Sequence, residues 1–491
     1  MEKSALVLLP LGITMLAPFA LWFLRKDINK REAVSLVAAI ASFLSVTALI
    51  PGVLNGTVYI YPLFRILPGI SVKFCADGLS LIFALVATFL WILATVYNIG
   101  YMRGLKEHAQ TRYYFCFAVA IFGAVGVALS ANIFTLYLFY EIITIFTYPL
   151  VAHHQDAEGY HGGRKYLVYL MGTSKLFLLP AMLMTYVLAG TLDFNLADMV
   201  HGIFPDSADP VWVSVTYFLF LAGLAKAAII PLHNWLPSAM VAPTPVSALL
   251  HAVAVVKAGV FSISRIILSG FGVQTMDNLH LGEPTAYLAA LTIVAASLVA
   301  LTKDDLKARL AYSTVSQLSY IIVGVAMLTP VAVTGGLIHI ANHAFSKITL
   351  FFAAGAIFVA TGTKKISCMS GLGRRMPWTF GAFALATLSM IGVPPVCGFV
   401  SKWFLAEGAV EINNMLLLAA LLASTLLNAA YFGPVVYKAF FQSRPNEAET
   451  RQISEAPLAM VLPLALTALV SVVLGLYPDP FLNLIRAFGG F

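Results

Sequence analysis

The sequence predicts an all-α membrane protein of about fourteen transmembrane helices, forming a single polytopic domain over residues 1–491. Hydrophobic residues make up 60% of the chain and charged residues only 10%, whereas a soluble domain carries about 25% charged residues. Apolar runs of about 20 residues, the length a helix needs to cross a bilayer, recur along the whole sequence. The net charge of +7 does not indicate nucleic acid, because the basic residues are confined to particular loops.

The first apolar run, 4–24, lacks a clear cleavage site and ends directly at Arg25 and Lys26, so we expect a retained helix rather than a signal peptide. The eleventh and twelfth runs are long, and we expect those helices to be tilted or broken. The predicted spans are 4–24, 33–52, 78–98, 113–129, 132–152, 166–189, 211–230, 246–268, 286–302, 310–328, 331–360, 377–410, 414–437 and 457–477.

Lysine and arginine are distributed unequally between the two sets of loops. If the N-terminus lies outside, the odd-numbered loops hold most of the basic residues. The opposite side holds only Lys3, Arg65, Lys73 and Arg486, and its sixth loop is acidic. Basic loops face the cytoplasm in membrane proteins. We therefore expect a multi-pass protein of a prokaryotic plasma (inner) membrane with both termini on the outer side.

The sequence predicts neither a redox centre nor another cofactor. The cysteines, Cys75, Cys116, Cys368 and Cys397, are far apart and form no CxxC pair, so a disulfide framework or an iron–sulfur site is not expected. No GxGxxG motif follows a strand-like segment. Any redox chemistry is therefore expected to belong to partner subunits.

Several basic residues fall inside the predicted spans. Placing a lysine at the middle of a bilayer costs about 2.5–3.5 kcal/mol of insertion free energy. Such lysines are therefore expected to face the bundle interior, to pair with carboxylates or water, and to take part in the function of the protein. Arg265 is near a helix end, where its side chain can snorkel to the interface. The basic residues within spans are Lys175, Lys226, Lys257, Arg265, Lys347 and Lys402.

Glu141 lies about ten residues into the fifth span, which places it near the bilayer midplane at 1.5 Å per residue. It is the natural partner of a buried lysine, and Lys226 is the best candidate. Such a pair either takes part in ion movement or is a static contact between two helices. The sequence alone leaves both open.

Histidines and lysines align on two later spans. His339, His343 and Lys347 follow the spacing i, i+4, i+8, which puts them on one stripe of a helix. His251 and Lys257, six residues apart, can line successive levels of one cavity. This pattern is typical of a hydrated proton path. Spaced histidines can also bind a metal, but no cysteine or carboxylate completes a set within these spans, so no metal is expected there.

Helix breakers accompany two of the lysines. Pro231 follows Lys226, and Pro394, Pro395 and Gly398 precede Lys402. Proline frees backbone groups, which protein or water must satisfy inside a membrane. The pattern predicts broken helices at spans 7 and 12, as transporters use for a gated site; an ordinary kink is the alternative. Protons are favoured over sodium, which needs several oxygen ligands.

The segment GLAKAAIIPLHNWLPSAMVAPTPVSALLHAVAVVKAG (223–259) resembles the most characteristic segment of antiporter-like subunits. These subunits occur in respiratory complex I, in multisubunit cation/proton (Mrp-type) antiporters and in membrane-bound hydrogenases. The resemblance runs from about residue 75 to 410. Further matches are ADGLSL (76–81), KDDLKARLAYSTVSQLSY (303–320), ANHAFSKITLFFAAGAI (341–357), ISCMSGLGRRMP (366–377) and VPPVCGFVSKW (393–403).

The resemblance implies a fold with two inverted five-helix repeats, spans 4–8 (about 110–268) and spans 9–13 (about 286–440). It pairs Glu141 with Lys226 and makes Lys402 the terminal lysine. The chain lacks the long lateral helix of the largest complex I homologue, so a shorter relative is expected. The residues that the resemblance assigns to proton transfer are Glu141, Lys226, His251, Lys257, His339, His343, Lys347 and Lys402.

The expected function is therefore that of a proton-translocating membrane subunit of a larger respiratory or antiporter complex, without redox chemistry of its own. Its expected partners are other membrane subunits, including homologous antiporter-like subunits and redox subunits, together with lipid and protons. Alternatives are sodium/proton exchange and a structural scaffold without an ion path. A membrane hydrolase is disfavoured because no nucleophile–base set is present.

Overall fold

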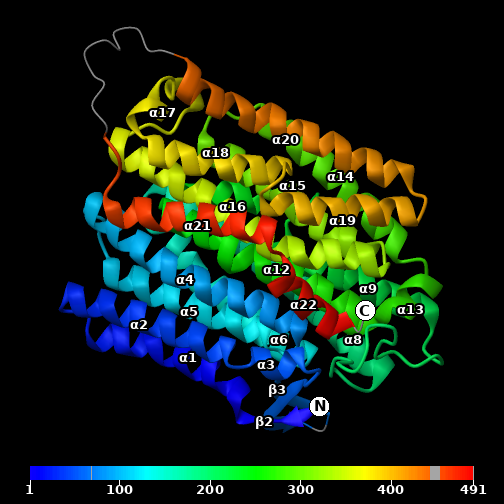
Figure 1. Cartoon of the computed structure of the whole chain (residues 1–491). Helices are drawn as coiled ribbons and strands as arrows, with labels where there is room; N and C mark the ends of the chain where they lie inside the picture. Colours follow the sequence, from blue (N-terminus) through cyan, green and yellow to red (C-terminus); the bar gives the residue numbers. More distant parts are fainter. Residues whose placement is uncertain (68, 443–453, 490–491) are drawn as a thin grey trace.

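The computed structural model describes residues 1–67, 69–442 and 454–489, and this part of the chain folds into a bundle of helices (Figure 1). The helices with α-geometry are α1 (Leu8–Phe23), α2 (Ile28–Thr47), α3 (Ile50–Leu54), α4 (Gly78–Gly104), α5 (Gln110–Ala128), α6 (Ile133–Val151), α7 (Ala157–Thr173), α8 (Leu179–Ala189), α9 (Pro210–Gly223), α10 (Trp235–Ser238), α11 (Thr244–Ala248), α12 (Val255–Arg265), α13 (Gly272–Asn278), α14 (Gly282–Leu301), α15 (Leu306–Ala326), α16 (Pro330–Thr361), α17 (Leu372–Arg375), α18 (Pro377–Ile391), α19 (Cys397–Glu411), α20 (Met415–Phe441), α21 (Leu458–Leu476) and α22 (Asp479–Gly489).

Shorter helical turns connect or continue these helices. Three of them are π-helical, a geometry often found at functional sites. The π-turns are η2 (Ser174–Leu178), η5 (Leu249–Val253) and η6 (Ile266–Phe271), and the 3₁₀ turns are η1 (Ala5–Val7), η3 (Ala225–Ala227), η4 (Ala239–Val241) and η7 (Ile366–Cys368).

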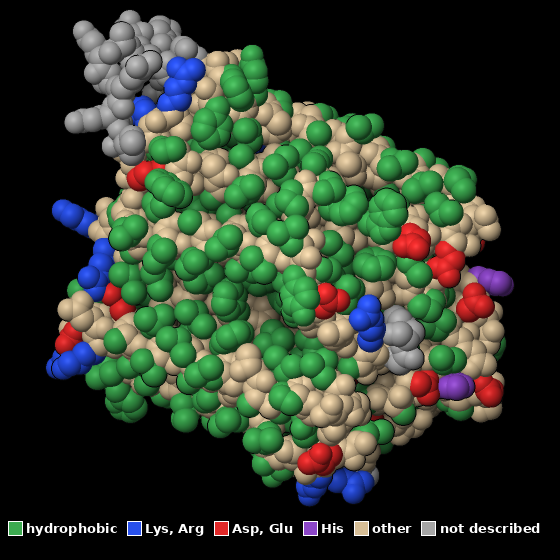
Figure 2. Space-filling model, viewed as in Figure 1, with side chains coloured by type: hydrophobic (Ala, Val, Ile, Leu, Met, Phe, Trp, Pro, Cys, Tyr) green, Lys and Arg blue, Asp and Glu red, His purple; other side chains and the backbone are tan. Residues whose placement is uncertain are grey.

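Among the described residues, 11 helical segments are long and apolar enough to cross a membrane, and α9 and α18 are shorter apolar helices. Figure 2 shows a broad band of hydrophobic side chains across the face in view. Lysine and arginine gather at the left end of this face, and acidic residues and histidines gather at the right end. The molecule is therefore a multi-pass membrane protein, as its composition predicts.

Both predicted helix breaks are present. After α9 the chain forms η3, passes through Ala228 at φ +57° and contains a cis bond between Ile230 and Pro231. After α18, Gly392 adopts φ +92°, which glycine tolerates without strain. Because the helix stops there, its last carbonyls have no helical partner, and they remain available to a side chain.

The all-α prediction is wrong for one small region. The strands β1 (Glu2–Lys3), β2 (Tyr59–Leu67) and β3 (Ile70–Ala76) form a three-stranded sheet in the order β1-β2-β3, and β2 and β3 are antiparallel. The β2 sequence, YIYPLFRIL, is rich in the aromatic and β-branched residues that favour strands. Helix α22, which follows the last predicted span, was also not predicted.

Arg265 does not snorkel, and that expectation is wrong. Its side chain is fully buried, and its two terminal nitrogens donate to the carboxylate oxygens of Asp77 at 2.6 and 2.8 Å and to Ser80 Oγ at 3.0 Å. Asp77 is also the N-cap of α4, accepting from the Ser80 amide at 2.8 Å. This pair therefore joins the start of α4 to the end of α12.

We expect Asp77→Asn to destabilise the fold by about 3–5 kcal/mol, because it leaves Arg265 as a buried charge without a counter-ion. Asparagine keeps the N-cap, so the effect reports the lost charge. Thermal unfolding in detergent measures it. Lys30→Gln, which removes one partner of an exposed ion pair, is the control and should leave the melting temperature unchanged. Equal melting temperatures for Asp77→Asn and the wild type would contradict this account.

Candidate functional site

Glu141 lies near the middle of α6, and its ion-pair partner differs from the one predicted. Its Oε2 atom is 3.2 Å from the Nζ atom of Lys175, and its Oε1 atom accepts a hydrogen bond from the Ser174 hydroxyl. Lys175 also donates to the Tyr137 hydroxyl at 2.6 Å. The Lys175 side chain is 45% exposed on the surface of this chain, so the expectation that it is buried is wrong. Both Ser174 and Lys175 belong to the π-turn η2.

Lys226 lies in the broken segment η3 and is fully buried. Its ammonium group donates to the Tyr140 carbonyl at 2.8 Å and to Thr144 Oγ1 at 2.7 Å, and it lies 3.1 Å from the centroid of the Tyr140 ring. It makes no ion pair with Glu141 among the described residues. Lys226 nevertheless contacts α6 at Tyr140 and Thr144, on both sides of Glu141 in sequence, so its ammonium group packs on the helix that carries Glu141.

The η3 segment lies unusually close to α12. A β-carbon at Gly259 would come within 2.4 Å of the Lys226 carbonyl carbon and 2.3 Å of the Ala227 nitrogen. Only glycine permits this approach, because real β-carbons essentially never come within 3.0 Å of such atoms. The contact brings the backbone that carries Lys226 against the helix that carries Lys257.

A chain of polar side chains continues from α12 through α16 to α19. The Nζ atom of Lys257 is 2.8 Å from His343 Nδ1. The His343 ring stacks near that of His339, with centroids 5.9 Å apart. His339 in turn is 2.8 Å from Ser401 Oγ and 3.1 Å from Gln317 Oε1. All five residues are buried, so this chain crosses the interior of the bundle.

The remaining two lysines are also held by neutral oxygens. Lys347 donates to Ser313 Oγ at 2.9 Å and to the Leu310 carbonyl at 3.4 Å. Lys402 donates to the carbonyls of Met390 and Ile391, both at 2.9 Å. These are the carbonyls that the break after α18 leaves without helical partners. The second break therefore supplies the ligands of its own lysine.

His251 is part of the π-turn η5, and its ring packs 4.6 Å from that of Phe351, measured between centroids. The side chain is fully buried, yet neither ring nitrogen has a hydrogen-bond partner among the described residues. An unpaired polar group of this kind is costly. Its ring lies beside Phe351 of α16, the helix that carries His339, His343 and Lys347.

The structure brings Lys257, His339 and His343 into one connected line, and Ser401 joins that line to the helix of Lys402. It places Lys226 of η3 against α6, the helix that carries Glu141, without an ion pair between the two among the described residues. No charge pattern in the sequence predicted the roles of Ser174, Tyr140, Thr144 and Gln317, because hydroxyl and amide side chains are uncharged. The sequence showed that Lys175 is a charged residue within a span, but it did not show that Glu141 is its partner.

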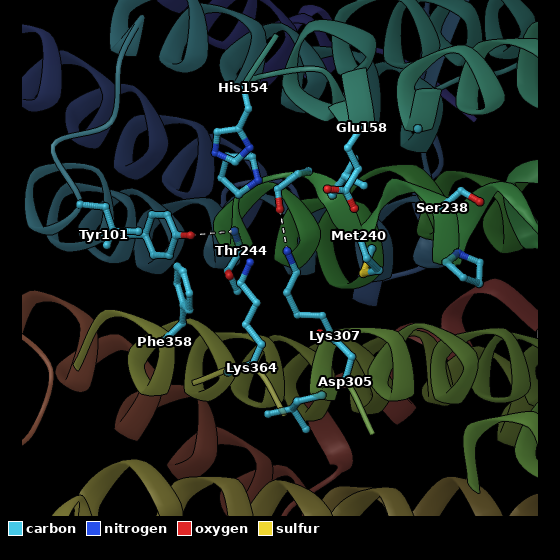
Figure 3. A pocket seen from close by; sticks show the side chains of 18 of the residues that line it. Tyr101, His154, Glu158, Ser238, Met240, Thr244, Asp305, Lys307, Phe358 and Lys364 are labelled. Carbon is cyan, nitrogen blue, oxygen red and sulfur yellow. Dashed lines mark hydrogen bonds between the residues drawn. The ribbon is translucent and has the colours of Figure 1, made fainter. Parts of the chain in front are cut away.

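A cavity of about 770 Å³ opens at the end of the bundle that carries the basic loops (Figure 3). His154 and Glu158 approach it from one side, and Lys307 and Lys364 approach it from the other. Lys307, at the start of α15, donates to the Ala242 carbonyl at 2.6 Å. The cavity is therefore lined by titratable groups from several loops.

A membrane bundle with broken helices and an interior line of lysines and histidines defines an antiporter-like membrane subunit. The family model described as "NADH:quinone oxidoreductase/Mrp antiporter, TM" matches residues 130–432. A second model, "NADH-Ubiquinone oxidoreductase (complex I), chain 5 N-terminus", matches residues 68–114. The first match covers more than half of the chain and contains all eight predicted proton-transfer residues.

Relatives agree with these matches. NADH-quinone oxidoreductase subunit N of Desulforudis audaxviator is 32% identical over 97% of this chain and 96% of its own length. Na(+)/H(+) antiporter subunit A1 of Staphylococcus haemolyticus is 30% identical over 84% of this chain. The matched region is 53% of that antiporter subunit, so this chain spans about half of its length.

Two solved structures share the fold. A chain of the membrane-bound sulfane sulfur reductase, an archaeal respiratory membrane complex, superposes with a TM-score of 0.88 and 27% identity over 99% of this chain and 97% of its own. A chain of the Mrp complex from Dietzia sp. gives a TM-score of 0.82 and 21% identity over 98% and 96%. The chain belongs to the NADH:quinone oxidoreductase/Mrp antiporter family of membrane subunits, which confirms the resemblance in its motifs.

We expect Gly259→Ala to displace η3 and to destabilise the protein by about 1–3 kcal/mol, because the added methyl group meets backbone atoms that cannot rotate away. Thermal unfolding in detergent measures this change. Gly172→Ala is the matched control, since nothing lies within 4 Å of its added β-carbon, and it should be neutral or slightly stabilising. Similar melting temperatures for the two variants would disprove the close approach at Gly259.

Proposed function

We propose that this subunit moves protons through the membrane along Glu141, Lys226, His251, Lys257, His339, His343, Lys347 and Lys402, coupled to partner subunits of a larger complex. The observation that carries the proposal is the buried line from Lys257 through His343 and His339 to Ser401, in which the two histidine rings are stacked with centroids 5.9 Å apart. Two pairs in that line, Lys257 with His343 and His339 with Ser401, are each hydrogen-bonded at 2.8 Å. This distance is within the 2.6–3.2 Å reach that proton transfer requires.

The ligands of the lysines support proton transfer rather than static pairing. Lys226, Lys347 and Lys402 are bound by carbonyl and hydroxyl oxygens. Neutral oxygens accept a hydrogen bond from an ammonium group without fixing its charge by an ion pair. In this mechanism a change in the Glu141–Lys175 contact alters the electric field at Lys226, and water completes the step from Lys226 to Lys257.

The cavity beside Lys307 is the proposed site of proton uptake. Lys307 lines the cavity, while the Leu310 carbonyl and Ser313 Oγ, one and two turns further along α15, accept hydrogen bonds from Lys347. Three to six residues of α-helix correspond to about 5–9 Å. The first turns of α15 therefore connect the cavity to the interior stripe on α16.

The finer topology is part of the proposal. We infer fourteen spans, with two inverted five-helix repeats at about 110–268 and 286–440 and both termini outside. The two breaks, each beside a lysine in its own half, support the repeats, and the bias of basic residues supports the orientation. Relatives named NADH-quinone oxidoreductase subunit N and Na(+)/H(+) antiporter subunit A1 support homologous antiporter-like subunits and redox subunits as partners. The membrane is then a prokaryotic plasma membrane.

We expect Glu141→Gln and Lys226→Met each to lower proton pumping by about 100-fold or more, because each removes a group that must gain and lose charge. Fluorescence quenching in inverted vesicles that contain the assembled complex measures pumping, and a native gel verifies assembly. Glu283→Gln, at an exposed position of α14, is the isosteric control. Normal pumping in both variants would reject the assigned roles, and pumping that requires sodium at fixed pH would favour sodium/proton exchange.

We also expect Lys257→Met and His343→Ala to be non-additive, because both interrupt one step between the same two atoms. The double variant should pump no more slowly than the slower single variant, by the same vesicle measurement. Rates that multiply in the double variant would place the two residues on separate paths. Correct assembly of all three variants is the required control.

A further inference from the structure

A cluster of one glutamate and three histidines lies outside the helical spans, on the loops that follow α4 and α6. The carboxylate of Glu107 is at its centre. Its Oε2 atom is 3.7 Å from His153 Nε2 and 4.0 Å from His108 Nδ1, and its Oε1 atom is 3.4 Å from His154 Nε2. One ligand atom from each of Glu107, His108 and His153 can be chosen so that all lie within 4.8 Å of one another.

His153 is the unusual member of the cluster. Its side chain is fully buried, and neither ring nitrogen has a hydrogen-bond partner among the described residues. A neutral imidazole has one ring nitrogen with a lone pair that can bind a metal ion. Arg112 holds only the His153 carbonyl, at 2.8 Å. A buried polar ring with no partner calls for an explanation, and a bound ion is one that fits the neighbouring Glu107 and His108.

We propose that Glu107, His108 and His153 bind a divalent transition metal ion, with Zn²⁺ as the best fit. Two imidazoles and one carboxylate form a donor set that zinc accepts while keeping a fourth position open. Tetrahedral bonds of about 2.0–2.2 Å place neighbouring donor atoms about 3.4 Å apart. His108 is half exposed, so its ring can move the short distance that closes the set.

The surroundings select the class of ion and the fourth ligand. Ca²⁺ and Mg²⁺ prefer sites made of oxygen atoms, whereas imidazole suits Zn²⁺, Cu²⁺ and Ni²⁺. His154, already beside Glu107, or a water molecule can fill the fourth position. The guanidinium of Arg112 opposes a cation, and the Glu107 carboxylate offsets that charge.

The site lies at the proposed proton-uptake cavity. Glu107 and His154 both line this cavity, and a bound ion would tie the loop after α4 to the loop after α6 at its edge. Metal binding does not depend on the proposed function. An effect of the ion on proton flux does depend on it, so the two are measured separately.

The test is Zn²⁺ titration by calorimetry of the complex that contains the full-length chain, with visible d–d absorption of Co²⁺ as a second readout. The wild-type complex should bind one more Zn²⁺ ion per chain than a Glu107→Gln/His108→Ala variant. His108→Ala alone, at a half-exposed position, should weaken Zn²⁺ binding by about tenfold to 100-fold. Metal affinity falls by this much even when the lost residue only hydrogen-bonds to a metal ligand.

His161→Ala is the matched control, because His161 lines the same cavity but lies outside the cluster, and it should bind Zn²⁺ as the wild type does. Unchanged melting temperatures of the variants without metal exclude misfolding as the cause. Equal Zn²⁺ stoichiometry and affinity in the wild type and the Glu107→Gln/His108→Ala variant would overturn the site, whatever the effect of Zn²⁺ on pumping.

Discussion

The cost of keeping ammonium groups in an apolar interior governs this structure. A buried cation needs hydrogen-bond acceptors, and the carbonyls of a regular helix are already paired with amides, so each has only its second lone pair to offer. The protein meets this requirement by interrupting helices. The break after α18 frees the carbonyls that bind Lys402, and the break after α9 places Lys226 against the side chains and backbone of α6. The helix breaks and the lysines are therefore one feature.

Two ways of treating a buried cation coexist in the bundle. Arg265 is paired with the Asp77 carboxylate through two hydrogen bonds, and such an arrangement fixes the charge and joins two helices. Lys226, Lys257 and Lys347 are fully buried, and none of them forms an ion pair with a carboxylate in the part of the chain that the structure describes. Arginine remains charged in proteins, whereas lysine can lose its proton. The permanently charged residue therefore has a carboxylate partner, and the lysines do not need one. The difference agrees with the proposal that these lysines exchange protons while Arg265 holds two helices together.

Periodicity and charge in the sequence predicted the helical bundle, both breaks and the alignment of the α16 stripe, because these follow from local spacing. They did not predict the small sheet, since β2 is short and apolar and resembles part of a span. The error over Arg265 arose because position within a helix does not reveal a partner that is distant in sequence, here Asp77. The same reason explains Lys175, whose contact with Glu141 depends on how α7 and η2 pack on α6.

The half-exposed position of Lys175 has a consequence for the strength of its contact with Glu141. One side of this ammonium group is bounded by the chain itself, and the other by whatever adjoins η2. Attraction between opposite charges grows as the surrounding dielectric constant falls. Hydrocarbon beside η2 would tighten the contact, and a wet boundary would loosen it. The medium outside the bundle thus sets how firmly the carboxylate within it is held.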